Sequence, residues 1–259
     1  KIQKKFIKIL EKFLMNRCAF SIMVNDEIAD EVQKIHKLKE RPIVVRNTPS
    51  LWNINEDICL NKKKQLKKEL NIDENSDCAI ILYHGVLMRD RGIEQLIRLV
   101  SINTKIKAVI LGNGQGNYVQ ELKKLVDELQ VQENILFKPA VPIEELWKYV
   151  GAVDIGMILA PAICKNHLYS LPNKFFENIQ SETPIICPNY PSMGNIVNQY
   201  GIGLTCDPLD LNQINECVEK LRLDKQLYTS CKENMKRAKA VFCWEKEKNT
   251  LIEKYKNIL

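Results

Sequence analysis

The chain has 259 residues, of which 45% are hydrophobic and 27% are charged, and its formal net charge is +6 at pH 7. This composition is ordinary for a globular protein with room for one or two domains. No run of eighteen or more apolar residues occurs, which excludes a membrane-spanning helix of the usual length. Because the chain begins at Lys1 rather than Met, we expect a fragment or a trimmed form of a longer protein.

The nine cysteines are an odd number and form no CxxC pair. Neither a disulfide framework nor a zinc site is therefore indicated, and a reducing, cytoplasmic location fits best. Much of the positive charge lies in two runs, residues 1–13 and 61–70. Such runs are usually solvated helix faces, but they are also compatible with peripheral contact at the inner face of an anionic membrane. No recognition motif accompanies them, so we expect no nucleic acid partner.

The first 50 residues contain too little structure to close a sheet of their own. Residues 1–15 predict an amphipathic helix, with Ile2, Phe6, Ile9, Leu10 and Phe13 able to share one face. A strand (19–24), a helix (26–38) and a second strand (41–49) follow. We interpret residues 1–50 as the remnant of a preceding domain and the connection out of it.

From Cys78 onward, short apolar runs alternate regularly with segments of helical spacing. The predicted strands are 78–85, 107–112, 134–141, 154–160, 184–188 and 203–207, and the helices between and after them are 93–102, 118–130, 143–150, 173–180, 193–200 and 211–223. Continuously apolar strands alternating with helices indicate a parallel sheet covered on both faces. We therefore predict an α/β fold, a doubly wound parallel sheet of Rossmann-like type over residues 51–240, with its ligand site at the carboxyl ends of the strands. Residues 227–240 and 244–258 also have helical spacing.

Five segments in this order resemble the family 4 retaining glycosyltransferases of bacterial polysaccharide synthesis, which have two Rossmann-like domains (the GT-B type). The segments are AFSIMVNDEIADEV, PIVVRNTP, ILYHGVLMRDRGIEQLI, VILGNGQG and SLPNKFFENIQSETPII, and the resemblance runs from about Cys18 to Leu259. It implies that residues 51–240 bind a nucleotide-sugar donor, that residues 1–50 belong to the acceptor domain, and that residues 241–259 form a helix crossing back to that domain. It also implies transfer with retention of configuration to a glycan or lipid-linked acceptor, without a cofactor.

The donor diphosphate needs positive charge, which a site without a metal supplies with cations and helix N-termini. The segment RDRG lies between the first strand of the sheet and its helix, so Arg91 inherits the phosphate role that the family assigns there. Val86 occupies a position where the family usually has an arginine, and Arg89 is a candidate replacement for that cation.

A carboxylate early in the helix 173–180 can accept hydrogen bonds from both ribose hydroxyls, and the family uses the glutamate matching Glu177 in this way. Tyr169 stands where the fuller family motif has a second glutamate that contacts the sugar. The backbone near the helix start could face the sugar or the phosphates, and the main chain after the third strand lies beside the base in the family. The expected donor-binding residues are Gly85, Arg89, Arg91, Lys138, Pro139, Ala140, Tyr169, Ser170, Leu171, Asn173, Lys174 and Glu177.

The catalytic residues stay unknown from the sequence. His84 reads as a packed strand-end residue more readily than as a base, while His167 is a candidate for a substrate contact. The resemblance places a further catalytic histidine in the absent part, so we expect the chain alone to bind donor and turn over little. A nucleotide-sugar epimerase of the same architecture and a non-catalytic nucleotide-sugar-binding module stay as alternatives. We further expect the helix 1–15 and the final helix 244–258 to pack near each other, away from the site of Arg91 and Glu177, so that residues 1–45 contact residues 244–259.

Overall fold

The computed structural model of the protein describes residues 2–114 and 116–257. Lys1, Gln115, Ile258 and Leu259 lie outside the described residues, as do the side chains of Ile2, Lys4 and Lys5. The predicted face position of Ile2 and the end of the predicted final helix therefore fall outside them. None of the described helices is long and apolar enough to cross a membrane.

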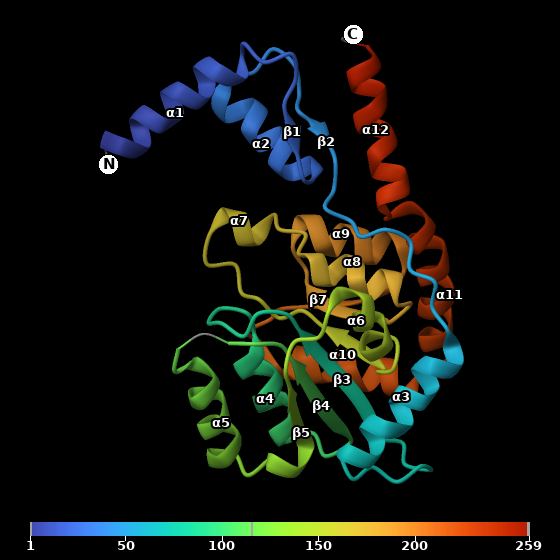
Figure 1. The fold of residues 1–259 in the computed structure, drawn as a ribbon. Coiled ribbons are helices and arrows are strands. Elements are labelled where there is room, and N and C mark those ends of the chain that lie inside the picture. Colours follow the sequence, from blue (N-terminus) through green and yellow to red (C-terminus); the bar gives the residue numbers. More distant parts are fainter. Residues whose placement is uncertain (1, 115, 258–259) are drawn as a thin grey trace.

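A six-stranded, fully parallel sheet forms the centre of the larger unit (Figure 1). Its strand order is β5-β4-β3-β6-β7-β8, so the chain moves outward on one side of β3, then returns and moves outward on the other. The strands are β3 (Ala79–His84), β4 (Ile106–Leu111), β5 (Ile135–Lys138), β6 (Ile155–Met157), β7 (Ile185–Pro188) and β8 (Gly203–Cys206). This order is that of the doubly wound Rossmann fold, which confirms the predicted fold class.

Helices cover both faces of this sheet, because both faces of nearly every strand are apolar. In β3, Ile81 and Tyr83 join the core beneath α4 (Ile93–Ile102), α5 (Tyr118–Glu128) and α10 (Leu211–Leu223). Ile80 and Leu82 join the core on the other face, beneath α3 (Glu56–Glu69) and α6 (Ile143–Val150). A third core lies around β7 and is covered by α8 (Asn173–Gln180), α9 (Pro191–Tyr200) and α11 (Lys225–Val241).

Two shorter helices complete this unit. The single-turn α7 (Lys165–Leu168) lies in the long loop between β6 and α8, and the 3-10 turn η1 (Gln132–Asn134) precedes β5. Helix α3 begins at Asn55, whose side chain accepts a hydrogen bond from the backbone nitrogen of Ile58. The basic run of residues 61–70 is thus largely a helix face, and that helix buries Leu66 against the sheet.

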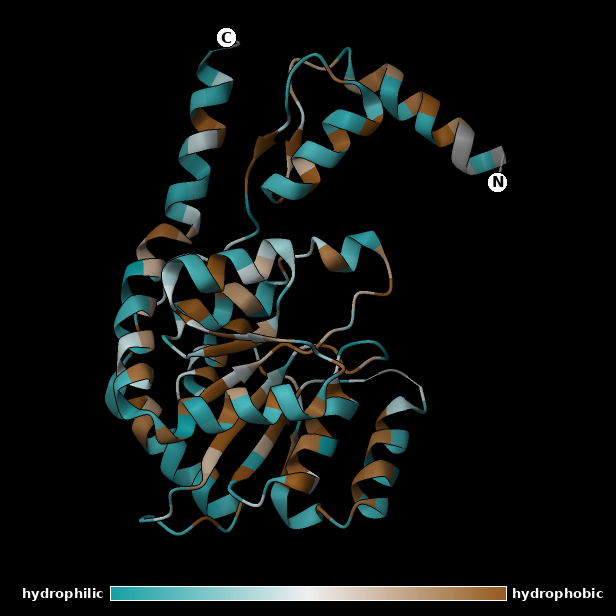
Figure 2. Cartoon of the chain, turned by 180° about the vertical axis from the view of Figure 1, so that it is seen from behind, coloured by the Kyte–Doolittle hydropathy of each residue, from teal (hydrophilic) through white to brown (hydrophobic). Residues whose placement is uncertain are grey.

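The N-terminal unit consists of α1 (Ile2–Met15), β1 (Ile22–Met23), α2 (Asp26–His36) and β2 (Ile43–Val44). Its two strands pair in parallel and form a sheet by themselves. The apolar side chains of α1 stay in solvent, with exposed fractions between 44% and 66% for Phe6, Ile7, Ile9, Leu10, Phe13 and Leu14. Figure 2 shows this helix extending outward with hydrophobic residues along it.

Two chain crossings join the units: the connection around residues 45–55 and the start of α12 (Trp244–Lys256) (Figure 1). Arg46 pairs with the buried Glu247 at 3.2 Å, and the ring of Phe20 packs edge-on against Tyr255 with centroids 5.2 Å apart. Lys254 lies 3.5 Å from Glu40. Contact between the first 45 residues and the final helix is therefore confirmed for residues 20–45. The predicted packing of the first helix near the final helix is wrong, because α1 projects away from α12 and its apolar side chains stay exposed (Figure 1).

Candidate functional site

The strand order reverses between β3 and β6, so the carboxyl ends of these strands open the crevice where doubly wound folds bind ligands. The loop after β3 and the glycine turn after β4 meet at this edge. The nitrogen of Gly85 donates to the carbonyl of Leu111, and a Cβ added to Gly112 would lie 1.9 Å from the Gly85 carbonyl oxygen. Only glycine allows this approach, so the predicted tight turn supports the loop that follows β3.

The centre of the crevice is a contact between the end of β3 and the start of α8. The Nε2 atom of His84 lies 2.8 Å from Oε2 of Glu177. His84 is the last residue of β3, and its side chain is only 4% exposed, against 13% for Glu177. Burial lowers the pKa of His84, while the neighbouring Glu177 acts in the opposite direction. Burial thus favours the neutral form of the imidazole.

Lys174 lies one helical turn before Glu177 and points to the same strand end. Its ammonium nitrogen lies 3.6 Å from the centroid of the Tyr83 ring, and it borders Gly85. Burial and the charge of Arg91 lower the pKa of Lys174 to about 7, against the opposing effect of Glu177. Arg91, Lys174 and Glu177 thus share one electrostatic environment, as a site for a charged ligand requires.

The loop 88–92 fixes Arg91 at the amino end of α4. Asp90 and Gly92 both have positive φ, of 61° and 77°. A side chain at Gly92 would collide with Leu159, whose carbonyl oxygen would lie 2.3 Å from the added Cβ. In the described part of the chain, Arg91 has no ion pair. Arg89 instead pairs with Glu121 of α5 at 2.5 Å, and its side chain is 67% exposed.

The main chain after β5 is tied to the glycine turn. The carbonyl of Lys138 accepts from the nitrogen of Gly112 at 2.9 Å, and the nitrogen of Ala140 donates to Oδ1 of Asn113 at 3.0 Å. Pro139 lies between them. The side chain of Lys138 turns away to α3, where it pairs with Glu69 at 2.6 Å.

The segment that precedes α8 contacts the N-terminal unit rather than Glu177. The carbonyl of Tyr169 accepts hydrogen bonds from Asn25 and from the hydroxyl of Ser192, the latter at 2.9 Å. The amide of Asn173 accepts from Asn47 at 2.9 Å.

The two residues between Tyr169 and Pro172 have local roles. The Ser170 hydroxyl donates to the carbonyl of His167 at 3.0 Å, and Leu171 packs against the core under α8 and α9. His167 itself contacts the carbonyl of Pro161 through Nδ1 at 3.1 Å.

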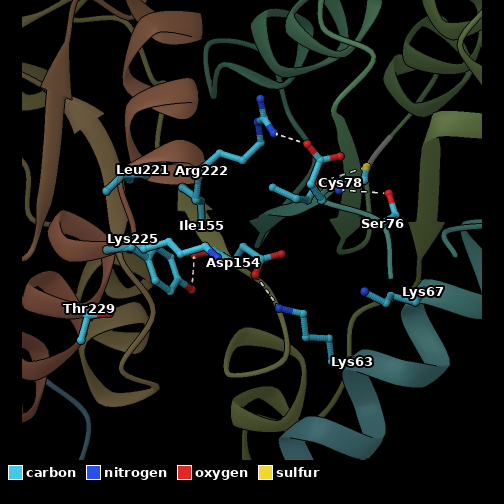
Figure 3. Close-up of a pocket in the computed structure, with 13 residues that line it drawn as sticks. Lys63, Lys67, Ser76, Cys78, Asp154, Ile155, Leu221, Arg222, Lys225 and Thr229 are labelled. Carbon is cyan, nitrogen blue, oxygen red and sulfur yellow. Dashed lines mark hydrogen bonds and ion pairs between the residues drawn. The ribbon is translucent and has the colours of Figure 1, made fainter. Parts of the chain in front are cut away.

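A cavity of about 350 Å³ lies at the opposite, amino-terminal edge of β3 and β6 (Figure 3). Two of the four cations that line it form ion pairs within the chain: Lys63 with Asp154, and Arg222 with Asp77 at 2.8 Å. Tyr228 donates to the carbonyl of Asp154 at 3.1 Å. None of the predicted site residues lines this cavity, so we locate the functional site at the carboxyl edge instead.

Among residues 2–114 and 116–257, no group of three His, Cys, Asp or Glu side chains could hold a metal ion. Binding of the donor diphosphate without a metal stays a prediction.

The fold is that of a Rossmann-like domain of the GT-B class. The family model described as "Glycosyl transferases group 1" matches residues 62–238, and the chain therefore belongs to this family of glycosyltransferases. A search by sequence against curated proteins found no match.

Solved structures show the same architecture at low sequence identity. Anabaena HepE in complex with UDP is similar with a TM-score of 0.77 and 14% identity, over 96% of this chain and 67% of that one. Sucrose-phosphate synthase from Thermosynechococcus elongatus is similar with a TM-score of 0.78 and 17% identity, over 98% of this chain and 62% of that one. The C-terminal domain of the group 1 protein LpcC from Francisella tularensis is similar with a TM-score of 0.54 and 16% identity, over 71% of this chain and 94% of that one. The chain thus spans about two thirds of the length of HepE and of sucrose-phosphate synthase.

Sequence reasoning missed the partner of Glu177. The sequence indicated a packed residue at the strand end. His84 is indeed buried, but its ring also contacts Glu177, the residue predicted to bind the ribose. The available signal was its position, because the last residue of a strand at the site edge faces the crevice.

Proposed function

We propose that this chain is the donor-binding part of a glycosyltransferase that transfers a sugar from a nucleotide sugar, with retention of configuration, to a glycan or lipid-linked acceptor of cell-surface polysaccharide synthesis. The observation that carries the proposal is the grouping of Glu177, Lys174 and Arg91 at the point where the strand order reverses. The complexes of HepE with UDP and with UDP-glucose, in a protein of the same fold, support it.

Each group of site residues binds a different part of the donor. Arg91 and Lys174 lie where they can offset the diphosphate charge, which grows as the nucleoside diphosphate departs. Helices α4 and α8 add the partial positive charge of their amino ends. Glu177 accepts hydrogen bonds from the ribose hydroxyls, and the main chain of Lys138, Pro139 and Ala140 borders the base. Because cations and helix ends meet the phosphate charge, activity should survive a chelator such as EDTA.

The acceptor half and the catalytic histidine belong to a larger protein in this proposal, so the chain alone binds donor and turns over little. We propose a cytoplasmic location with peripheral contact at the inner membrane face. The exposed apolar residues of α1, together with the described cations Lys8 and Lys12, support that contact.

A non-catalytic donor-binding module is the second candidate. Val86 stands where a cation is usual and is 58% exposed, and Tyr169 contacts Asn25 through its carbonyl. The chain thus lacks the family's cation at position 86 and its glutamate at position 169. Arg89 does not replace the cation, because it pairs with Glu121. Donor hydrolysis or transfer by the complete protein separates an enzyme from a module.

Calorimetry on the Glu177→Ala variant tests the donor site. A thermal-shift panel of UDP-, GDP- and dTDP-sugars first selects the donor. Replacing Glu177 should then weaken binding of the selected donor by about 2–4 kcal/mol, because two hydrogen bonds to a charged acceptor are lost. Glu144→Ala, an exposed glutamate on α6, is the control and should bind as the wild type does. An unchanged dissociation constant for Glu177→Ala would remove the ribose assignment.

A further inference from the structure

We infer that His84 is the positioning residue for Glu177, and that this pair makes the site selective for nucleotides whose ribose carries both hydroxyls. The inference rests on the proposed donor site, which it deepens. It begins from the contact between Nε2 of His84 and Oε2 of Glu177 at 2.8 Å.

The backbone under His84 is firmly held. β3 pairs with β4 over all six of its residues, in a register that sets His84 beside Leu111, and with β6 on its other side. Every residue of β3 is buried. A side chain on a central strand keeps a defined direction, and precise positioning of a ligand group needs such a rigid support.

The chemistry of the two groups fixes the direction of the hydrogen bond. An imidazole nitrogen donates only where it carries a proton, and a carboxylate can only accept. The Nε2 atom therefore carries the proton and donates to Oε2. This bond selects one orientation of the carboxyl group, because both partners are largely shielded from water.

The other carboxyl oxygen is left for a ligand. In the described part of the chain, no hydrogen bond reaches Oε1 of Glu177. Lys174 does not hold the carboxylate either, since among the described residues its ammonium group has no ion pair and lies over the Tyr83 ring. His84 is thus the described group that orients Glu177, which leaves Oε1 and the remaining lone pairs of Oε2 for the ribose hydroxyls.

The test compares full and dideoxy nucleotides. UDP and GDP are titrated calorimetrically, each beside its 2′,3′-dideoxy counterpart, into wild type, His84→Leu and His84→Gln. For His84→Leu, the nucleotide that wild type prefers should bind about tenfold more weakly, while its dideoxy form changes by less than about twofold. His84→Gln should restore most of the loss, because its amide nitrogen donates at a similar reach.

A double-mutant cycle and thermal unfolding complete the design. If His84 acts through Glu177, the effects of His84→Leu and Glu177→Ala should not add. Equal losses for the full and dideoxy nucleotides in a folded His84→Leu protein would overturn the inference, as would unchanged binding. If His84→Leu does not fold, the same comparison is made with His84→Ala: loss of selectivity in that folded variant supports the inference, and selectivity equal to that of the wild type overturns it.

The two proposals fail differently in this experiment. If wild type binds none of UDP, GDP and dTDP, the proposed donor site itself is wrong. Binding of dTDP alone, which lacks the 2′-hydroxyl, would overturn the inferred selectivity and leave the donor site standing. If wild type binds and Glu177→Ala weakens binding while folded His84 variants behave as wild type, only the positioning role is lost.

Discussion

Both units of this chain combine parallel strands with amphipathic helices, with different results. In the larger unit, α4 buries Ile93, Leu96, Ile97, Leu99 and Val100 against a six-stranded sheet. In the N-terminal unit, α1 has an equally clear apolar stripe, yet its apolar side chains remain largely exposed beside a two-stranded sheet. An amphipathic helix is stabilised by the layer that it covers, so the size of the sheet decides the burial.

The largest expected effect contrasts aromatic residues from the two units. Phe176→Ala should lower the free energy of unfolding by about 3–5 kcal/mol, because the Phe176 ring on α8 is fully buried in the core and its removal leaves a cavity. Phe6→Ala, at a side chain that is 66% exposed on α1, should change it by less than about 0.5 kcal/mol. Chemical denaturation measures both. A loss of several kcal/mol at Phe6 would show that α1 is packed in solution.

The next effect concerns the crossing between the units. Arg46→Met leaves the buried carboxylate of Glu247 without its cation, so we expect a loss of about 2 kcal/mol in the free energy of unfolding. Arg41→Met removes the exposed pairs with Asp26 and Asp30 and should cost less than about 1 kcal/mol. Equal effects of the two substitutions would mean that the crossing contributes no more than a surface pair.

Nucleoside diphosphate binding should depend on pH through Lys174, which lies in the larger unit. Since the pKa of Lys174 is lowered to about 7, a bound diphosphate gains most from this group below that pH, and nucleoside diphosphate binding should weaken about tenfold between roughly pH 6.5 and pH 8.5. The lowered pKa also means that the folded state binds fewer protons than the unfolded state, so this group's contribution to stability rises with pH above about 7.

Calorimetry across pH on two variants isolates that contribution. Lys174→Met should lose the extra pH dependence, which leaves only the titration of the nucleotide itself. Lys8→Met, an exposed lysine on α1, should behave as the wild type does. If Lys174→Met kept the full dependence, the titrating group would lie elsewhere.

The smallest effect sharpens the contact between the units at the donor loop. Asn25 caps α2 by accepting from the nitrogen of Ile28 and also donates to the carbonyl of Tyr169. Asn25→Ala should cost about 1 kcal/mol of stability, mainly through the lost cap. Asn25→Ser keeps a capping oxygen and removes the amide donor, so hydrogen exchange should increase around Tyr169 at a smaller cost in stability. Unchanged exchange in both variants would show that this contact does not order the loop.

The order and type of the elements followed from the sequence because local pattern and burial agree throughout the larger unit. Helices α4, α6, α8 and α10 begin and end at the predicted residues. The strands of the sheet were also predicted, with ends that differ from the observed ones by at most three residues. Continuous apolar runs bounded by glycine, proline or polar residues have few alternative readings. The short helix α7 and the strand order were not predicted, because neither has a periodic signal of its own.

The sequence by itself determined which residues share an element, and so it placed Lys174 and Glu177 on one face of one helix at spacing i, i+3. Only the tertiary structure decided what those residues meet. Glu177 meets His84 across 93 positions of sequence, while Arg89 and Lys138 turn to Glu121 and Glu69 on neighbouring helices. The physical reason is that periodicity reports which side of an element is apolar, whereas the partner of a polar side chain depends on how separate elements pack.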